Sequence, residues 1–368
     1  MELICWSLPN LENISENEIR EILGLNSKKI LDSRLIVKVK SINDYYSLAY
    51  SCRSLTRVLI LLKKIEFKTE KDLLNKLNKE DFKFIKKSFC VKAKRFGEHE
   101  FNSQSISTKL GALILKKIKT NVDFKNPETI IFLDIIDNTC FLCIDKLGLE
   151  LNKRYYKIKT HYQDLNPCLA FSLVKLSDYK PKKILLDPFC GCGTILIEVA
   201  LYGLNIPPLS LKKDIIKIPK KIMDKEDKRI KKTKLKIYGL DTFHYNIQNA
   251  RINSKVAKVF DNLKLFNFDV EWLDTKFKKN SVDIVITNPP FVSKKYNEKE
   301  ISNLYKQFFN QISYILNNKG NLVIITTKPD LIIKNAKEYK FQISKEINTN
   351  IGDAKYKIII FQCNQKNS

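Results

Sequence analysis

The sequence predicts an α/β protein in which an open, mostly parallel sheet with helices on both faces follows smaller α+β modules. Two observations support this fold class. After about Lys175, apolar strand-like runs alternate with helix-like segments, which is typical of sheets built from strand–helix–strand crossovers. Before that residue, short strands and helices follow each other without regular alternation. The 368 residues are enough for two or three domains.

The first 65 residues are expected to form the first α+β module. Its expected elements are a strand at 3–9, a helix at 14–23, a strand at 33–41 and a long helix at 44–65. Ser15 is a candidate N-cap of the first helix, and Gly24 is a natural stop for it. On the long helix, Arg53 and Arg57 lie four residues apart, so their side chains would share one face and could meet an anion.

Residues 66–150 are expected to form a second α+β module. Its expected elements are a helix at 69–82, a strand at 88–97, a helix from about 103 to 119 and two strands between 129 and 148. Ser103 or Ser105 would cap the second of these helices. Residues 151–175 are expected to form a linker, whose end is marked by Pro167.

The remaining residues, 176–368, follow the pattern of a parallel sheet. The expected strands are at 182–189, 235–241, 263–270, 282–290 and 320–328, with closing strands at 341–347 and 355–363. The expected helices are at 193–203, 244–257 and 301–318. A basic insertion at 205–236 interrupts this order and contains twelve Lys or Arg residues against four acids. The insertion is either a solvated loop or an arm that contacts phosphates.

The charge of the chain indicates a polyanionic partner. There are 66 Lys and Arg residues against 40 Asp and Glu residues, which gives a formal net charge of +26. An AT-rich genome also favours Lys, but it would usually raise Glu along with Lys. Nucleic acid is therefore the better interpretation.

The cysteine pattern indicates reduced thiols, as in a cytoplasmic protein. The nine cysteines are scattered and form no disulfide framework. Cys140 and Cys143 form a lone C-x-x-C pair without a second pair or a nearby histidine, so no metal site is expected. Neither a signal peptide nor an apolar run of 18 residues is visible, so no membrane association is expected.

Polar or glycine-rich residues follow each predicted strand of the C-terminal sheet, at the edge where ligands bind in this fold class. The first strand ends in Asp187 and a glycine-rich loop, and the second ends in Asp241. The third is followed by Phe268 and Asp269. Glycines let the backbone approach a ligand, and a carboxylate at a strand end can bind ribose hydroxyls. The loop lacks the lysine of a P-loop and the glycine spacing of a dinucleotide site.

The motifs at the strand ends resemble those of class I S-adenosylmethionine-dependent amino methyltransferases. The segments LLDPFCGCGT, YGLD, FD and TNPPF stand in the order of motifs I to IV of that class. Residues 91–111 resemble a THUMP domain, 48–62 resemble a ferredoxin-like module, and 151–170 resemble the linker to the catalytic domain. The chain is thus similar to THUMP-containing tRNA guanine-N2 methyltransferases over nearly its whole length except 205–236.

The resemblance implies a Rossmann-like catalytic domain, S-adenosyl-L-methionine as the cofactor, no metal, and tRNA bound through its acceptor stem and 3′ end. The residues implied to bind the cofactor are Asp187, Phe189, Cys190, Gly191, Cys192, Gly193, Thr194, Asp241, Phe268, Asp269 and Asn288. The residues implied to hold the target base and act in catalysis are Asn288, Pro289, Pro290 and Phe291. The basic residues expected to contact RNA are Arg53, Arg57, Lys92, Lys94, Arg95, Lys153 and Arg154.

The TNPPF loop fits methylation of an amine that is a poor nucleophile. The lone pair of the guanine exocyclic amine is delocalised into the ring. The Asn288 amide oxygen and the Pro289 carbonyl can accept its two N–H groups, which localises the lone pair on nitrogen. The two prolines stiffen the loop, and Phe291 offers a face on which an extruded base can stack.

Several alternatives stay open from the sequence. The same loop serves DNA adenine-N6 and protein glutamine-N5 methyltransferases, but neither class explains the N-terminal half. An inactive tRNA-binding scaffold is a further alternative, which the intact acidic residues and Asn288 oppose. Asn288, where Asp is typical of enzymes acting at tRNA position 10, favours position 6. Phe291 and Val292 replace the frequent Tyr and Gly. We expect a monomer that needs no partner subunit.

Overall fold

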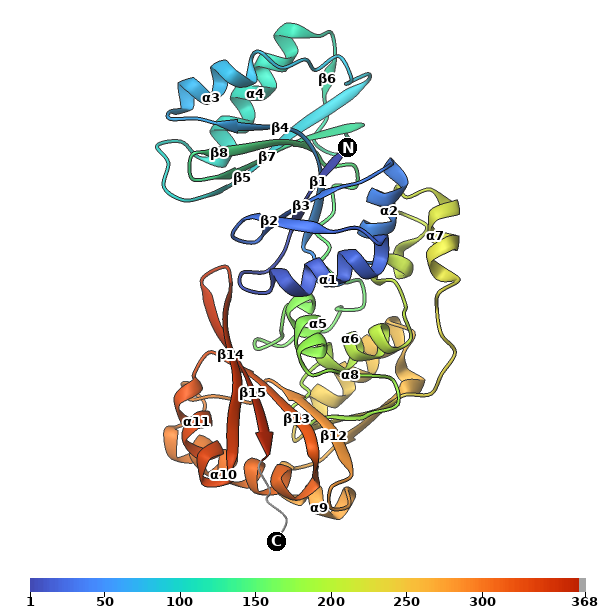
Figure 1. The fold of residues 1–368 in the computed structure, drawn as a ribbon, viewed down its shortest axis with the longest axis vertical. Helices are drawn as coiled ribbons and strands as arrows, with labels where there is room; N and C mark the ends of the chain where they lie inside the picture. Colours follow the sequence, from blue (N-terminus) through green and yellow to red (C-terminus); the bar gives the residue numbers. More distant parts are fainter. Residues whose placement is uncertain (364–368) are drawn as a thin grey trace.

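The computed structural model describes residues 1–363, which form two stacked halves that pack against each other (Figure 1). The first module contains β1 (Glu2–Trp6), α1 (Glu12–Leu23), β2 (Ser27–Leu31), β3 (Arg34–Lys38), α2 (Ile42–Ser51) and β4 (Arg57–Glu66). The second contains α3 (Glu70–Leu77), β5 (Ser88–Phe96), α4 (Ser103–Lys117), β6 (Asn121–Val122), β7 (Thr129–Ile136) and β8 (Thr139–Ile144). Their strands join into one eight-stranded sheet of order β2-β3-β1-β4-β8-β7-β5-β6.

The prediction of one long helix at 44–65 is wrong. Only its first part is helical, as α2, and the chain then enters β4. The run Val58–Ile60 is buried because β4 lies inside the sheet, paired with both β1 and β8. A continuous apolar run of a buried strand cannot be distinguished from a buried helix by its spacing, which explains the error. Arg53 therefore lies in the α2–β4 loop, and Arg57 is the first residue of β4.

Two expected helix caps are also corrected. Helix α1 begins at Glu12, so Ser15 lies inside the helix, where its hydroxyl is 2.8 Å from that of Ser7. Asn102 caps α4, because its side chain accepts a hydrogen bond from the Ser105 backbone N–H at 2.7 Å. Gly24 ends α1 with a φ of 69°, as the sequence predicts.

The C-terminal half is a seven-stranded sheet of order β11-β10-β9-β12-β13-β15-β14. Its strands are β9 (Ile184–Asp187), β10 (Lys236–Asp241), β11 (Leu263–Asn267), β12 (Val282–Thr287), β13 (Leu316–Thr326), β14 (Phe341–Ile351) and β15 (Ala354–Cys363). Its helices are α5 (Pro167–Leu176), α6 (Thr194–Gly203), α7 (Lys220–Asp227), α8 (His244–Val256), α9 (Leu273–Lys276), α10 (Glu298–Ile315) and α11 (Pro329–Glu338). Strands β9 to β13 are parallel, and the closing hairpin is antiparallel, which confirms the predicted fold class.

Helices cover both faces of this sheet, and the alternation of side chains along β9 shows how. Leu185 packs into the core that α5, α6 and α8 share, whereas Leu186 packs into the core under α9, α10 and α11. The order of the strands reverses between β9 and β12, which opens a crevice at their carboxyl ends. Within residues 1–363, the helices are too short or too polar to cross a bilayer.

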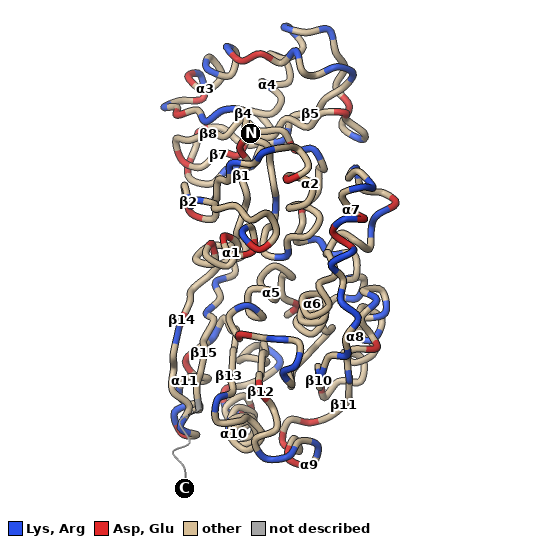
Figure 2. The backbone as a smooth tube through the Cα atoms, turned by 45° about the vertical axis from the view of Figure 1, so that its right-hand side comes forward, with Lys and Arg blue, Asp and Glu red and all other residues tan. Residues whose placement is uncertain are grey.

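Two segments of the chain differ from their expected structure. The last part of the predicted linker is α5, which is almost wholly buried in the catalytic core and begins with Pro167 at its first position. The insertion 205–236 forms a 3-10 turn and α7, which lies beside α2 (Figure 1). Ile222 and Met223 of α7 are buried in the core of the first module. The insertion is thus a packed bridge between the halves, and most of its lysines are exposed. Figure 2 marks the positions of these basic residues along the backbone.

Candidate active site

A cavity of about 440 Å³ lies at the carboxyl ends of β9, β10, β11 and β12. Nine of the residues predicted to bind cofactor or base line it: Asp187, Phe189, Cys190, Gly191, Thr194, Asp241, Asp269, Asn288 and Pro290. Five others do not line it: Cys192, Gly193, Phe268, Pro289 and Phe291. Four successive strand ends therefore meet at one site, as their order in the sequence predicts.

Asp187 ends β9 as a buried carboxyl group beside the cavity. The Thr287 hydroxyl donates to it at 2.7 Å, and the Phe189 backbone N–H donates at 3.1 Å. Burial raises the pKa of Asp187 to about 7, although these two hydrogen bonds act in the opposite direction. No Lys or Arg within the described residues forms an ion pair with this carboxyl group. Asp187 is thus prepared to receive a cationic ligand group.

Asp241 connects the end of β10 to the glycine-rich loop. One of its carboxylate oxygens accepts from the Phe243 N–H at 2.9 Å and from the Asn246 side-chain amide at 3.0 Å. The other accepts from the Gly191 N–H at 3.0 Å. These bonds orient the carboxylate at the cavity wall, where a diol such as a ribose edge can bind.

The glycine-rich loop brings backbone rather than side chains to the cavity. Gly191 and Gly193 have φ values of 50° and 84°, a region that other residues rarely adopt. A Cβ on Gly193 would also lie 3.1 Å from the Cβ of Ala250. Gly193 occupies the N-cap of α6 without a side-chain cap, and the Thr194 hydroxyl is buried without a hydrogen-bond partner. Uncapped N–H groups at a helix start favour a bound anion, such as a carboxylate.

The loop cysteines are not nucleophiles. Cys190 and Cys192 are both buried, and burial raises the pKa of the Cys190 thiol well above its usual range. Burial likewise raises the pKa of Cys192 to about 11. Both thiols are therefore protonated near neutral pH, and they act as small apolar packing groups.

The two residues predicted after the third strand lie in different places, one at the cavity and one in the core. Asp269 lines the cavity, and its side chain accepts from the Glu271 N–H at 3.1 Å. Phe268 instead packs against the core beneath α10, with the Lys276 ammonium 4.5 Å above its ring. The cavity is also lined by Phe243, two residues after Asp241, an aromatic residue that the sequence reasoning missed.

The TNPPF loop places Asn288 at the cavity, and contacts with α10 and the linker hold the loop in place. Pro289 is buried, and the Pro290 carbonyl accepts a hydrogen bond from the Tyr305 hydroxyl at 2.6 Å. The Asn288 side-chain amide donates to the Gln163 carbonyl of the linker at 3.1 Å. The linker residues His161 to Leu165 also line the cavity, although no motif in the sequence singles them out.

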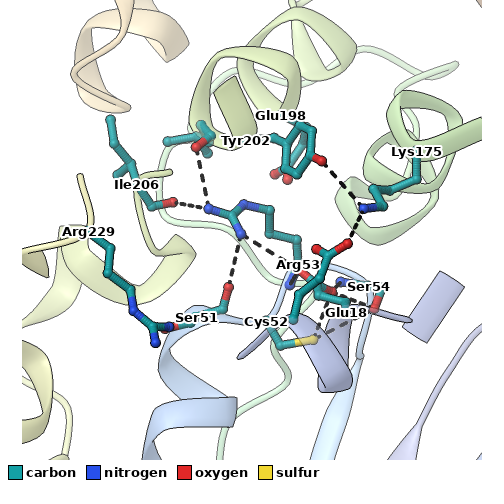
Figure 3. A network of polar contacts seen from close by, with 12 residues as sticks. Glu18, Ser51, Cys52, Arg53, Ser54, Lys175, Glu198, Tyr202, Ile206 and Arg229 are labelled. Atoms are coloured by element: carbon teal, nitrogen blue, oxygen red, sulfur yellow. Dashed lines mark hydrogen bonds and ion pairs between the residues drawn. The ribbon is translucent and has the colours of Figure 1, made fainter. Parts of the chain in front are cut away.

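The basic residues expected to contact RNA fall into two groups, and three of them need correction. Arg53 and Arg154 are buried, and their guanidinium groups bond to protein atoms at the junction of the two halves. Figure 3 shows the contacts of Arg53. Arg57 is also buried and forms an ion pair with Asp145 at 2.5 Å. A side chain that already neutralises a buried carboxylate is not available to a phosphate. The three guanidinium groups are therefore held by protein atoms, and Arg57 also borders the second cavity.

The other residues expected to contact RNA lie near a second cavity. Lys92, Lys94 and Lys153 are exposed and line a groove of about 960 Å³ between β5, α4 and residues 148–155. Arg95 is half-buried, with its guanidinium 5.6 Å from the centre of the Phe101 ring, and does not line the groove. Cys140 and Cys143 are buried in β8, and residues 1–363 contain no cluster of His, Cys, Asp and Glu that could hold a metal.

Comparisons with known proteins agree with this architecture. Residues 154–357 match the RMKL-like methyltransferase domain, and residues 67–145 match the THUMP domain. The tRNA (guanine(6)-N2)-methyltransferase of Methanocaldococcus jannaschii is 31% identical, over 94% of this chain and 95% of that protein. The enzyme of the same description from Archaeoglobus fulgidus is 28% identical, over 96% of this chain and 90% of that protein.

A solved structure has the same fold. The crystal structure of SMU.472 in complex with SAH superposes with a TM-score of 0.84 at 22% sequence identity. The match covers 100% of this chain and 99% of that chain. The arrangement of the N-terminal modules on the catalytic domain is thus shared over the whole length.

Proposed function

We propose that this chain, which belongs to the THUMP-domain-containing tRNA guanine-N2 methyltransferase family, methylates the exocyclic amine of guanosine 6 in the acceptor stem of tRNA. The chain is a methyltransferase by its family. The observation that supports the reaction most directly is the placement of Asn288 in one cavity with Asp187, Asp241 and the glycine-rich loop. The choice of position 6 is supported by the two archaeal relatives and by Asn288 before the prolines.

The cavity fits S-adenosyl-L-methionine, which supplies a methyl group on a positively charged sulfur when bound. The buried, unpartnered Thr194 hydroxyl and the uncapped start of α6 match a carboxylate. The Asp187 carboxyl group matches an ammonium group, and the Asp241 carboxylate matches a pair of ribose hydroxyls. Asp269 and Phe243 lie where a purine would be held by a hydrogen bond and a ring contact.

Catalysis by the protein's own residues is positional and electrostatic. The Asn288 amide oxygen, which faces the cavity, accepts one N–H group of the guanine amine, which raises the electron density on its nitrogen. The Pro289 carbonyl, on the next residue of the same loop, is the predicted acceptor of the second N–H group, although Pro289 itself does not line the cavity. The prolines fix this loop, and the Tyr305 hydroxyl holds it from behind through the Pro290 carbonyl. The target base must leave its stack to reach the cavity. A fixed loop then restricts the base to few orientations, which favours the reactive one.

The tRNA is expected to lie along the basic groove of the second module and reach the cavity with its acceptor stem. Lys92, Lys94 and Lys153 line that groove, where they can neutralise phosphates near the 3′ end. The formal net charge of +26 supports such binding. The THUMP module and the catalytic domain occur in one chain, which supports action as a monomer without a partner subunit. The cytoplasmic location expected from the cysteines stays a prediction.

Methyl transfer from labelled S-adenosyl-L-methionine to unmodified tRNA transcripts tests this proposal. We expect N2-methylguanosine in the digested product. Replacing guanosine 6 with adenosine should abolish transfer, and replacing guanosine 10 should not. If methyl transfer is lost only when guanosine 10 is replaced, the methylated position is 10. Binding of tRNA and cofactor without transfer would identify an inactive scaffold.

A further inference from the structure

The linker forms a fixed wall of the cavity rather than a flexible tether. The buried side chain of Asn253 bonds both backbone groups of Lys159, accepting from its N–H at 3.0 Å and donating to its carbonyl at 2.8 Å. The same amide donates to the Cys192 carbonyl at 3.1 Å. Residues 159–164 are therefore tied to the glycine-rich loop.

The turn that follows is locked by its own side chains. The His161 N–H donates to the Asp164 carboxylate at 3.1 Å, and the Gln163 N–H donates to the His161 ring nitrogen Nδ1 at 3.2 Å. The Lys157 ammonium lies 3.6 Å from the same carboxylate. These bonds fix the direction of the Gln163 carbonyl, which accepts from the Asn288 amide.

The fixed carbonyl orients the amide of Asn288. Because an amide has its two donors on one atom and its acceptor on the other, binding Nδ2 to the linker turns Oδ1 away from it. Oδ1 is the atom that the proposed reaction requires as an acceptor for the guanine amine. A carboxylate at this position could not donate to the Gln163 carbonyl and would face it with a like partial charge.

The Gln163 side chain is itself unsatisfied. Gln163 lines the cavity, yet its Nε2 is buried without a hydrogen-bond acceptor. A buried amide donor without a partner is costly, so such a group in a cavity wall is expected to find its partner in the ligand. Next to the C2 amine, guanine presents N1–H, a donor, and N3, an acceptor. Of these two, N3 alone can pair with Nε2.

We propose that Gln163 positions the target guanine: its carbonyl orients Asn288, and its side-chain amide donates to guanine N3. This inference rests on the proposed function, because it assigns a residue to the same base pocket. It gives the linker a role in orienting the target base as well as in connecting the RNA-binding modules to the catalytic domain.

A paired change in protein and substrate tests this hydrogen bond. Methyl transfer is measured for the wild-type chain, Gln163→Leu and Gln163→Glu, each with tRNA carrying guanosine or 3-deazaguanosine at the target position. The analogue keeps the C2 amine and N1–H but replaces N3 with C–H. Gln248→Leu is a matched control, since Gln248 is an exposed glutamine on α8 outside the cavity.

We expect Gln163→Leu to lower kcat/KM on guanosine tRNA by about tenfold, the usual effect of one buried hydrogen bond. With tRNA that carries the analogue, the kcat/KM of the wild-type chain should fall by a similar factor. The kcat/KM of Gln163→Leu should be almost the same on the two tRNAs. On guanosine tRNA, Gln163→Glu should have a lower kcat/KM than Gln163→Leu, because its carboxylate faces the N3 lone pair. On the analogue this lone pair is absent, so the difference between the two variants should shrink. SAH affinity and melting temperature should stay at the wild-type values.

If the analogue changes the activity of the wild-type and Gln163→Leu proteins by equal factors, the hydrogen bond to N3 is overturned. Full activity of both Gln163 variants on guanosine tRNA would also overturn it. These outcomes leave the proposed function intact, provided that the wild-type chain forms N2-methylguanosine. Absence of transfer by the wild-type chain would overturn the proposed function and this inference together.

Discussion

Two regions of this chain bury charged side chains, and they do so in opposite ways. At the cavity, Asp187 and Asp241 are buried with hydrogen bonds from N–H and O–H groups, but neither forms an ion pair within the described residues. At the junction of the two halves, each buried charge has a partner of opposite sign. Unpaired buried acids beside a cavity indicate a ligand site, whereas paired charges indicate a structural role.

The junction centres on two arginines. The Arg53 guanidinium donates to the Ile206 carbonyl at 3.0 Å and lies 3.7 Å from the Glu18 carboxylate (Figure 3). Arg154 donates to the Glu198 carboxylate at 3.1 Å and to the Arg53 carbonyl at 2.8 Å. Glu198 lies on α6, which begins at the glycine-rich loop. The junction therefore sets the distance between the RNA-binding groove and the cavity.

The largest expected effect is at the cavity. Asn288→Ala should lower kcat by about 10²–10³, as the loss of one preorganised electrostatic group does in other enzymes. The melting temperature and the SAH affinity should stay close to those of the wild-type chain. Single-turnover methyl transfer, with SAH titration by calorimetry as the control, measures this difference. A loss of SAH affinity as large as the loss of rate would assign Asn288 to cofactor binding instead.

A substitution at the junction should lower the folding stability of the protein. Arg154→Met leaves the fully buried Glu198 carboxylate without its cation, which costs on the order of 3–5 kcal/mol of folding free energy. Chemical denaturation of the two proteins measures this cost. The double variant Arg154→Met/Glu198→Leu removes both charges and should recover part of it. If the double variant is no more stable than the single one, the ion pair is not the cause.

The insertion 205–236 can be divided into its two surfaces. The variant Lys221→Gln/Lys225→Gln/Lys228→Gln removes three exposed cations from α7 and its end without changing the buried face. If these lysines bind phosphates, the slope of log K against log salt should become shallower by about one for each phosphate that is no longer neutralised. Filter binding of tRNA at several salt concentrations measures the slope.

Tyr50→Phe is the matched control for the buried face. The Tyr50 hydroxyl donates to Asp227 of α7 at 2.9 Å, so this variant loosens the attachment and leaves the surface charge unchanged. It should lower the melting temperature slightly and leave the salt slope unchanged. An unchanged slope in the lysine variant would mean that the insertion is only a structural bridge.

The sequence predicts the cavity better than the junction, for a physical reason. Asp187 and Asp241 end strands, and Asp269 and Asn288 closely follow strands. Parallel strands bring their carboxyl ends together whatever the intervening chain does. Arg53 and Arg154 find their partners through interactions between residues far apart in the sequence, which no local pattern reports. Gln163 was missed for the same reason, since its linker reaches the cavity through Asn253 and Asn288.

The smallest expected effect concerns pH and separates the two kinds of buried charge. Because burial raises the pKa of Asp187 to about 7, the carboxyl group of the free protein is mostly neutral at pH 6 and mostly ionised at pH 8. If Asp187 binds the ammonium group of SAH only when ionised, the affinity should rise by up to about tenfold over this interval. Calorimetric titrations at several pH values measure the change, and Asp187→Asn should remove it. The folded pKa lies above the unfolded value, so this group lowers the stability of the free protein progressively from about pH 4 to pH 7. A flat affinity profile in the wild-type chain would mean that the ligand ammonium is held by another group, and Asp187 would then be as structural as Glu198.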